Sequence, residues 1–302
     1  MSHWGSTARL LSVQRAGASR VECAPMRELE LHSLNRGFAW QPRRGPFARV
    51  TAAQAAAYDE RGCFVLEDAF DAATLERVIA EIDPLEAKVE SFLQSRPDGR
   101  MFIARAGEIT FSTHLVARSP LLREFCSGPV FRDLCLDLIG PNVRLYWDQA
   151  VYKKPGTVDS FPWHQDNGYT FIDPQQYLTC WVALTDATEQ NGCPWVIPGL
   201  HRRGTLAHRT SDLGFVCVDE APPEAVAVSA RAGSIVVFSS LTPHATGPNR
   251  TDATRKSYIV QFAPEGAAAL RSDDGGEVIR EPASAPERQF PILVDGRAPS
   301  AD

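Results

Sequence analysis

Lysine is scarce in this chain of 302 residues, providing only four of its 31 basic side chains: Lys88, Lys153, Lys154 and Lys256. No Lys- or Arg-rich run is present, and the formal net charge is -6. A protein that coats nucleic acid needs clustered cations to neutralise phosphates, so the composition argues against that function. Scarce Lys beside abundant Ala, Arg, Gly and Pro indicates a GC-rich, bacterial genome.

Long apolar runs are absent as well. No stretch approaches the about 18 consecutive apolar residues that span a bilayer, which excludes a transmembrane helix. Residues 1–20 lack acidic side chains and contain several Arg and Ser, as transit peptides do, but they have no signal-peptide apolar core. We expect residues 1–50 to form a partly disordered leader of a cytoplasmic protein, with Met26 as an alternative start.

The sequence also lacks a paired-cysteine motif. Its seven Cys are odd in number, form no C-x-x-C and stand mostly among apolar neighbours. This predicts reduced thiols in the core of a cytosolic protein, without a disulfide framework or a structural zinc site. The residues are Cys23, Cys63, Cys126, Cys135, Cys180, Cys193 and Cys217.

Helical patterns occupy the N-terminal half of the chain, which is long enough for one large domain. Thr51 can cap an Ala-rich helix, and Gly62 ends it before an apolar segment. Asp71 can cap a second helix, whose apolar residues fall on one face. Helices are predicted over residues 51–58, 72–82 and 129–138, and a strand over 63–66.

From residue 143 onward the pattern changes to short apolar segments separated by Gly, Pro and Asn, which is typical of an all-β sandwich or barrel. The predicted fold is mainly β with a helical layer (α+β), with helices over 51–140 and a β core over 143–264. Residues 265–302 are expected to be an irregular tail in which 290–293 can dock on the domain. Strands are predicted over 143–153, 177–184, 194–197, 226–228, 234–238 and 256–262.

His164 and Asp166 stand two residues apart in the segment FPWHQD. On an extended strand this spacing places both side chains on one face and Gln165 on the other. An imidazole nitrogen and a carboxylate oxygen can then reach a single cation. The pair alone is a weak signal, because Asp166 could instead cap the turn formed with Asn167 and Gly168, so a metal site needs a third ligand.

His244, after the predicted strand 234–238, is the candidate third ligand, although it could instead be a loop residue bonded to backbone. Two imidazoles and one carboxylate on one side of a metal form a facial triad, which leaves open positions and suits non-haem Fe(II). Arg255 opens the strand predicted over 256–262. A guanidinium fixed in a β core needs an anion, and a carboxylate is its natural bidentate partner.

At this point the sequence resembles the phytanoyl-CoA dioxygenase-like (PhyH) family of Fe(II)/2-oxoglutarate-dependent oxygenases. The resemblance covers residues 51–264 and begins with the segment YDERGCFVLED. It continues through WHQD with Tyr169, WVAL from Trp181, NGCP, PGLH and the distal motif from His244 to Arg255. It implies a double-stranded β-helix (jelly-roll, cupin-like) core with N-terminal helices packed against it.

The resemblance implies that Arg255 pairs with the distal carboxylate of 2-oxoglutarate, helped by Thr246. Trp181 would line the same pocket, although an aromatic residue on a strand is equally well explained as core. Gln149 lies near the position from which family members contact this cosubstrate. The run ending at Lys154 departs from the Asn-Lys-Pro-like run of the family.

The resemblance also implies catalytic metal ligands and an activity: His164, Asp166 and His244 would bind Fe(II). The enzyme would use 2-oxoglutarate and O2 to hydroxylate a small molecule, a metabolite or natural-product intermediate, and release succinate and CO2. Related halogenases lose the carboxylate ligand, so Asp166 indicates oxygenation.

Substrate contacts are expected from Tyr169 and, at the pocket mouth, from His114 and Arg118. His201 and His208 lie in a polar loop, which favours structural or substrate-side positions over metal binding. The substrate-shaping regions are expected near residues 101–119, 202–224 and 265–302.

Two alternatives stay open. A jelly-roll metalloenzyme, such as a cupin-type dioxygenase, isomerase or epimerase, would use the triad without 2-oxoglutarate and would not need Arg255. A non-catalytic binding module on the same fold would not need the iron. Apart from the small-molecule substrate, no nucleic-acid or membrane partner is expected, and the sequence predicts neither the substrate nor the oligomeric state.

Overall fold

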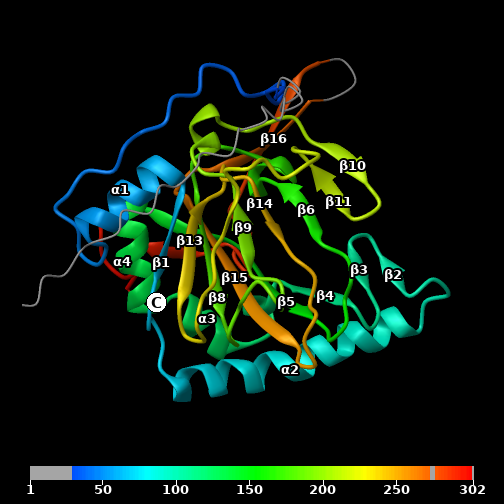
Figure 1. Ribbon diagram of the computed structural model, residues 1–302. Coiled ribbons are helices and arrows are strands. Elements are labelled where there is room, and N and C mark those ends of the chain that lie inside the picture. The colour runs from blue at the N-terminus through cyan, green and yellow to red at the C-terminus, as the bar shows by residue number, and fades with distance from the viewer. Residues whose placement is uncertain (1–28, 273–275, 301–302) are drawn as a thin grey trace, which may run out of the picture.

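A large antiparallel sheet forms one wall of the core in this computed structural model, which describes residues 29–272 and 276–300 (Figure 1). Its strand order is β1-β13-β8-β15-β5-β4-β3-β2, and β18 pairs with β5 beside this path. The strands are β1 (Cys63–Leu66), β2 (Arg100–Met101), β3 (Ala104–Arg105), β4 (Ile109–Thr113), β5 (Val143–Lys153), β8 (Leu178–Ala183), β13 (Ile235–Ser239), β15 (Arg255–Pro264) and β18 (Pro291–Leu293).

A second antiparallel sheet of short strands, in the order β12-β9-β14-β6, faces the large one. Trp181 and Phe238 of the large sheet share an apolar cluster with Trp195 and Val196 of β9. The expected double-stranded β-helix core is therefore confirmed, as two facing sheets rather than a closed barrel. The strands of this sheet are β6 (Phe161–His164), β9 (Pro194–Val196), β12 (Val226–Ala227) and β14 (His244–Thr246).

Side chains of β15 alternate between two environments, as the two-residue period of a strand requires. Tyr258, Val260 and Phe262 belong to the apolar cluster beneath the helices. Ile259 belongs to the cluster between the sheets. Arg255 has the same parity as Ile259, so the strand directs it into the interior.

Four α-helices contribute to the apolar cluster on the outer face of the large sheet. Thr51 caps α1 in a capping box with Gln54, and Gly62 ends that helix with a left-handed φ of 84°. A side chain at Gly62 would lie 2.4 Å from Thr242 Oγ1, so this turn requires glycine. The helices are α1 (Ala52–Arg61), α2 (Ala72–Gln94), α3 (Pro120–Cys126) and α4 (Pro129–Leu138).

Helix α2 is longer than predicted, because it continues past Ile82 and through Pro84 to Gln94. The buried face of the helix does not stop at Ile82, because Glu86 and Leu93 continue it. Glu86 is held there by Lys154 at 2.6 Å and by the hydroxyl of Thr110 at 2.8 Å. Tertiary contacts thus outweigh the helix-breaking tendency of the proline.

The described part of the expected leader, residues 29–50, packs against the domain. Leu31 forms a β-bridge with Leu206, while Trp40 and Phe47 pack against the core. The backbone amides of residues 48–50 donate to the carboxylate of Asp137 on α4. The candidate start Met26 and the transit-like stretch lie outside the described residues.

The described part of residues 265–302, which was expected to be irregular, contains three strands. Strand β16 (Ala268–Ser272) pairs with β7 (Phe171–Asp173) and with β17 (Val278–Pro282). The predicted docking of residues 290–293 is confirmed, because β18 pairs with β5 and buries Ile292 and Leu293. Above the core, β10 (Arg209–Ser211) and β11 (Gly214–Val216) form a hairpin (Figure 1).

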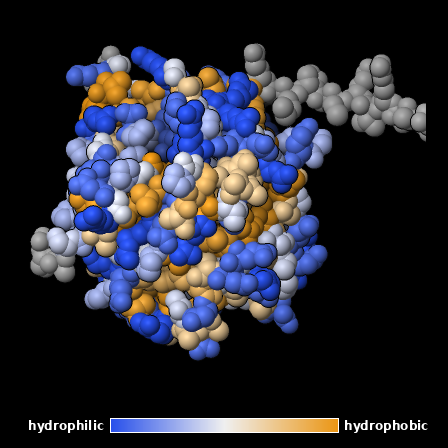
Figure 2. Space-filling view, turned by 90° about the vertical axis from the view of Figure 1, so that its left-hand side faces the viewer, coloured by the Kyte–Doolittle hydropathy of each residue, from blue (hydrophilic) through white to orange (hydrophobic). Residues whose placement is uncertain are grey.

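The surface in Figure 2 is mixed in polarity, and the described cysteines are unpaired, as the amino-acid composition predicts. On the side where Figure 1 places α1, hydrophobic and hydrophilic side chains intermingle (Figure 2). No helix of the described residues is long and apolar enough to cross a membrane. The six described cysteines are free thiols, and all but Cys217 are buried, while Cys23 lies outside the described residues.

Candidate active site

Two histidines stand directly opposite each other on neighbouring strands of the small sheet: His164 on β6 and His244 on β14. Their Nδ1 atoms lie 2.8 Å from the carbonyl of Pro162 and 3.0 Å from that of Thr242. A carbonyl can only accept, so each Nδ1 carries the hydrogen. Each Nε2 therefore has a free lone pair, as a metal ligand requires.

Asp166 completes this group from the first residue of the 3-10 turn η2 (Asp166–Gly168). Its Oδ2 accepts from Thr179 Oγ1 at 2.6 Å, and its Oδ1 lies 3.8 Å from Nε2 of His244. One ligand atom from each of the three residues lies within 4.8 Å of the others. Within the described ranges, these residues are the one group of three His, Cys, Asp or Glu that could hold a metal.

Burial prepares the imidazoles for a metal. His164 and His244 are 6% and 7% exposed. Desolvation, aided by the neighbouring His244, holds the pKa of His164 well below its usual value. The ring is consequently neutral near pH 7 and does not have to lose a proton to bind a cation.

The middle residue of the H-x-D segment anchors it from the other face, as the spacing predicts. Gln165 is fully buried and donates from Nε2 to the carbonyls of Gly204 at 3.0 Å and Leu241 at 2.6 Å. Its Oε1 accepts from the amide of Leu206 at 2.7 Å. The next turn is fixed by Asn167, which bonds the amide of Ile172. These contacts hold the two ligands of the motif on a rigid support.

Arg255 lies inside the core at 1% exposure and has no carboxylate partner among the described residues. Its Nη1 donates to Ser257 Oγ at 2.6 Å and to the carbonyl of Val151 at 3.3 Å, but Nε and Nη2 have no partner in the part of the chain that the structure describes. Burial lowers the pKa of Arg255 to about 10, which still leaves it charged near pH 7. A buried guanidinium with unpaired N–H groups is stabilised by an anion, and a carboxylate can accept two parallel hydrogen bonds from it.

One pocket between the two sheets contains the three candidate ligands and Arg255. Three further residues singled out in the sequence line it: Gln149, Trp181 and Thr246. The guanidinium carbon of Arg255 lies 5.2 Å from the Trp181 ring, so this tryptophan is both core and pocket wall. The other lining residues are Ile109, Phe111, Val151, Phe161, Thr179, Pro194, Phe238 and Ile259.

The lysine near this pocket is Lys153, which the sequence reasoning missed. Lys154 points instead to the helical side, where it pairs with Glu86. Lys153 is 1% exposed and donates to Thr246 Oγ1 at 3.2 Å. Strand alternation could have identified it, because Lys153 shares its parity with the inward-facing Gln149 on the same strand.

The predicted substrate contacts lie at different places. The ring of Tyr169 is 5.3 Å from that of His164, in edge-on geometry. His114 packs on Trp147 with a left-handed φ of 56°, and its Nε2 lies 3.4 Å from Arg288 Nη1. Arg118 is exposed, and neither it nor His114 lines the pocket of the triad.

His201 and His208 make structural contacts. His208 bonds the amide of Gln165 at 2.9 Å and the carbonyl of Leu206 at 2.9 Å. Nε2 of His201 lies 3.2 Å from the carbonyl of Asp59. Burial lowers the pKa of both to about 4, so both are neutral near pH 7.

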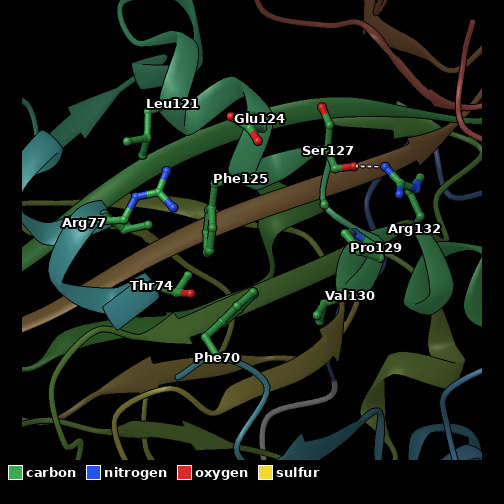
Figure 3. A pocket seen from close by; sticks show the side chains of 12 residues that line it. Phe70, Thr74, Arg77, Leu121, Glu124, Phe125, Ser127, Pro129, Val130 and Arg132 are labelled. Carbon is green, nitrogen blue, oxygen red and sulfur yellow. Dashed lines mark hydrogen bonds between the residues drawn. The ribbon is translucent and has the colours of Figure 1, made fainter. Parts of the chain in front are cut away.

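A cavity of about 520 Å³ lies apart from the triad, between α2, α3 and α4. Figure 3 shows the rings of Phe70 and Phe125 in it, with Arg77, Glu124 and Arg132 among the charged lining residues. None of the three candidate ligands lines this cavity. It therefore offers no site for the metal chemistry.

Comparison with known proteins agrees with this geometry. The family model "Phytanoyl-CoA dioxygenase (PhyH)" matches residues 58–257. The phytanoyl-CoA dioxygenase of Arabidopsis thaliana is 28% identical over 160 residues, which cover 51% of this chain and 56% of that protein. A probable alpha-ketoglutarate-dependent hypophosphite dioxygenase of Stutzerimonas stutzeri is 24% identical over 232 residues, covering 72% and 80%. The chain spans about half the length of the first curated relatives, 50% to 56%.

Solved structures share the fold. The epimerase SnoN, in complex with Fe3+, alpha ketoglutarate and nogalamycin RO, has a TM-score of 0.61 at 23% identity, with 80% of this chain and 97% of that chain covered. The family match runs from α1 to β15 and includes the three candidate ligands and Arg255. The chain belongs to the phytanoyl-CoA dioxygenase (PhyH) family.

Proposed function

We propose that this protein is a non-haem Fe(II)- and 2-oxoglutarate-dependent dioxygenase that hydroxylates a small molecule. The observation that carries the proposal is the shared pocket: a His-Asp-His group and a buried guanidinium without an anion both line it. A cosubstrate with a metal-chelating end and a distal carboxylate would satisfy both. The names of the Stutzerimonas relative and of the SnoN complex are consistent with such a cosubstrate.

In this proposal His164, Asp166 and His244 hold Fe(II) on one side, leaving its other positions to ligands. Bound Fe(II) supplies the oxidising chemistry, with O2 and 2-oxoglutarate consumed and succinate and CO2 released. Arg255 and Thr246 hold the distal carboxylate of the cosubstrate.

The walls of the pocket have their own role in this proposal. The apolar lining, which includes Ile109, Phe238 and Ile259, excludes water from the reacting centre. Gln149 and Trp181 confine the cosubstrate between its two anchors.

The two alternatives predict different behaviour. A jelly-roll metalloenzyme that does not use 2-oxoglutarate has no need for an anion at Arg255, and a binding module has no need for iron. The unpaired Nε and Nη2 of Arg255 favour the 2-oxoglutarate-dependent enzyme over both. Free thiols at the described cysteines further support a reducing location, the cytoplasm.

The test has two stages. In the first, iron content and 2-oxoglutarate binding are measured without O2, which requires no knowledge of the substrate. In the second, succinate release is scored over a metabolite panel that includes hypophosphite. We expect one Fe(II) per chain, iron-dependent 2-oxoglutarate binding and succinate release with at least one compound.

Asp166→Ala should lose iron and turnover. Asp173→Ala is the matched control, because Asp173 is an exposed carboxylate a few residues away that pairs with Arg280 at 2.8 Å. Normal turnover in Asp166→Ala would overturn the proposal. Iron binding without any affinity for 2-oxoglutarate would favour the first alternative, and absence of iron binding the second.

A further inference from the structure

Lys153 and Arg255 are two buried cations side by side. Arg255 lines the pocket of the candidate ligands, and Lys153 lines a small separate cavity that shares Ile109 and Phe161 with that pocket. They are paired residues on neighbouring strands, since Arg255 of β15 lies opposite Lys153 of β5. Each is 1% exposed. Both have the inward parity of their strands, with Gln149 on β5 and Ile259 on β15.

Lys153 has no carboxylate partner within residues 29–272 and 276–300. The closest acceptor of its Nζ is the carbonyl of Gly247 at 2.6 Å, followed by Thr246 Oγ1 at 3.2 Å. The carbonyls of Asp159 and Thr246 lie at 3.4 and 3.5 Å. The Asp159 carboxylate itself pairs with Arg105. Two neighbouring cations in the interior therefore share no buried anion among the described residues.

Such a pair is costly, because buried charges are normally compensated by an opposite charge. Burial, and secondarily the charge of Arg255, lower the pKa of Lys153 to about 7, against a smaller opposing effect of Asp159. Without an anion, Lys153 is thus only partly protonated near neutral pH. An anion bound between the two cations would restore its charge.

The contact with Thr246 gives Lys153 a second effect. Because an ammonium can only donate, Thr246 Oγ1 is the acceptor of the 3.2 Å contact. The hydroxyl proton of Thr246 is then free to be donated to another group. Thr246 lines the same pocket as Arg255, so the proton can be donated to an anion held there.

We propose that Lys153 is a second cation of the cosubstrate site: it orients the Thr246 hydroxyl and, with Arg255, stabilises the distal carboxylate of 2-oxoglutarate. This inference rests on the proposed function. Lys153 is a positioning residue here, since it contacts the Thr246 hydroxyl and backbone carbonyls. Binding of the cosubstrate transfers a proton from the buffer to Lys153, so the affinity falls as the pH rises.

The groups that face Lys153 are few. They are Arg255 from β15, Asp159 from the segment before β6, Arg105 of β3, which pairs with Asp159, and Glu108, which pairs with Arg105. Strand β14 and the residue after it contact Lys153 through the uncharged Thr246 and Gly247. Two of these groups have a lowered pKa: that of Lys153 is about 7 and that of Arg255 is about 10. Lys153 is accordingly the source of the expected pH dependence.

The experiment measures the Kd of 2-oxoglutarate for the Fe(II)-loaded full chain without O2, by calorimetry between about pH 6 and about pH 8.5. For the unchanged protein we expect Kd to rise about tenfold over this range. Calorimetry in buffers of different ionisation enthalpy should show net proton uptake on binding near pH 7. This second measurement requires no variant.

Three substitutions sharpen the test. Lys153→Met should bind about tenfold more weakly at low pH and lose the pH dependence. Lys153→Arg, whose side chain stays charged, should bind 2-oxoglutarate tightly at all these pH values. Lys154→Met is the matched control, because the neighbouring lysine pairs with Glu86 outside the pocket and should leave Kd unchanged.

A shorter ligand provides a further control. 2-Oxobutyrate keeps the metal-chelating end but lacks the distal carboxylate, so its Kd should not respond to Lys153→Met. If Lys153→Met keeps the Kd and pH profile of the unchanged protein, or no proton is taken up, this inference is wrong while the proposed function stands. If the Fe(II)-loaded protein does not bind 2-oxoglutarate at all, the proposed function fails and this inference with it.

Discussion

Each candidate ligand is oriented by a contact that lies behind it. Backbone carbonyls fix the two imidazoles, and the Thr179 hydroxyl fixes one oxygen of Asp166. Gln261 extends this chain, because its amide nitrogen lies 3.3 Å from Thr179 Oγ1. Since that amide can only donate, the threonine proton is left for Asp166. The ligand set is thus assembled before a metal arrives.

Replacing Thr179 should weaken iron binding without removing a ligand. In Thr179→Val, Asp166 loses its 2.6 Å hydrogen bond and becomes free to rotate. We expect Fe(II) affinity to fall about 10- to 100-fold, as when comparable supporting contacts of metal ligands are removed. Competition with a chromophoric chelator measures the change.

Thr110→Val is the control for that substitution. Thr110 is also buried, and its hydroxyl bonds a carboxylate, Glu86, but on the helical side of the same sheet. The Thr110→Val variant should have a lower free energy of unfolding and an unchanged affinity for Fe(II). Equal iron affinities in the two variants would mean that the Thr179 contact does not prepare the site.

The spacing between the candidate ligands was a better guide to the site than the comparison of contiguous motifs. H-x-D and the later histidine predicted the His-Asp-His group because strand parity and strand pairing are regular. The motif comparison around Lys154 did not separate it from Lys153, although adjacent strand residues face opposite sides. The contact between His114 and Arg288 joins residues from distant parts of the chain, and no local pattern reports it.

At the scale of elements, the sequence predicted α1, α4 and most strands of the core from caps, breakers and apolar runs. The helix predicted over 72–82 is too short, since neither Pro84 nor Glu86 indicates by itself that a buried face continues. The buried partners of Glu86, Lys154 and Thr110, come from other elements. In the tail, Val278 and Ile279 of β17 are exposed and show no alternation, so only pairing with β16 makes this segment a strand.

Strand β18 should contribute measurably to stability although it lies beyond the expected catalytic unit. Ile292 is fully buried against the helix-covered face of the large sheet. Ile292→Ala should lower the free energy of unfolding by about 2–5 kcal/mol, the usual cost of such a truncation in a core. Urea unfolding measures it.

Val294→Ala is the matched control, because Val294 lies two residues away and is 46% exposed. It should change the free energy of unfolding by less than about 0.5 kcal/mol. A loss for Ile292→Ala no larger than this would show that the tail is energetically separate from the core. The division into residues 1–50, 51–264 and 265–302 would then be supported as a division of stability.

At the scale of the whole molecule, the two anchors of the proposed cosubstrate belong to different sheets. The candidate ligands come from β6, η2 and β14 at the small sheet, whereas Arg255 begins β15 of the large sheet. A metal alone would connect parts of the small sheet. A ligand held by both the metal and Arg255 would connect the two walls of the core.

This arrangement predicts coupled stabilisation by the two ligands. Without O2, Fe(II) should raise the Tm, and 2-oxoglutarate at about a hundred times its Kd should add a further increase of about 2–4 °C. Without metal the cosubstrate should add little, because one of its two anchors is missing. Arg255→Ala should keep the increase due to Fe(II) and lose the one due to 2-oxoglutarate, whereas Lys154→Met should keep both. An equal effect of 2-oxoglutarate on the metal-free protein would contradict the shared pocket.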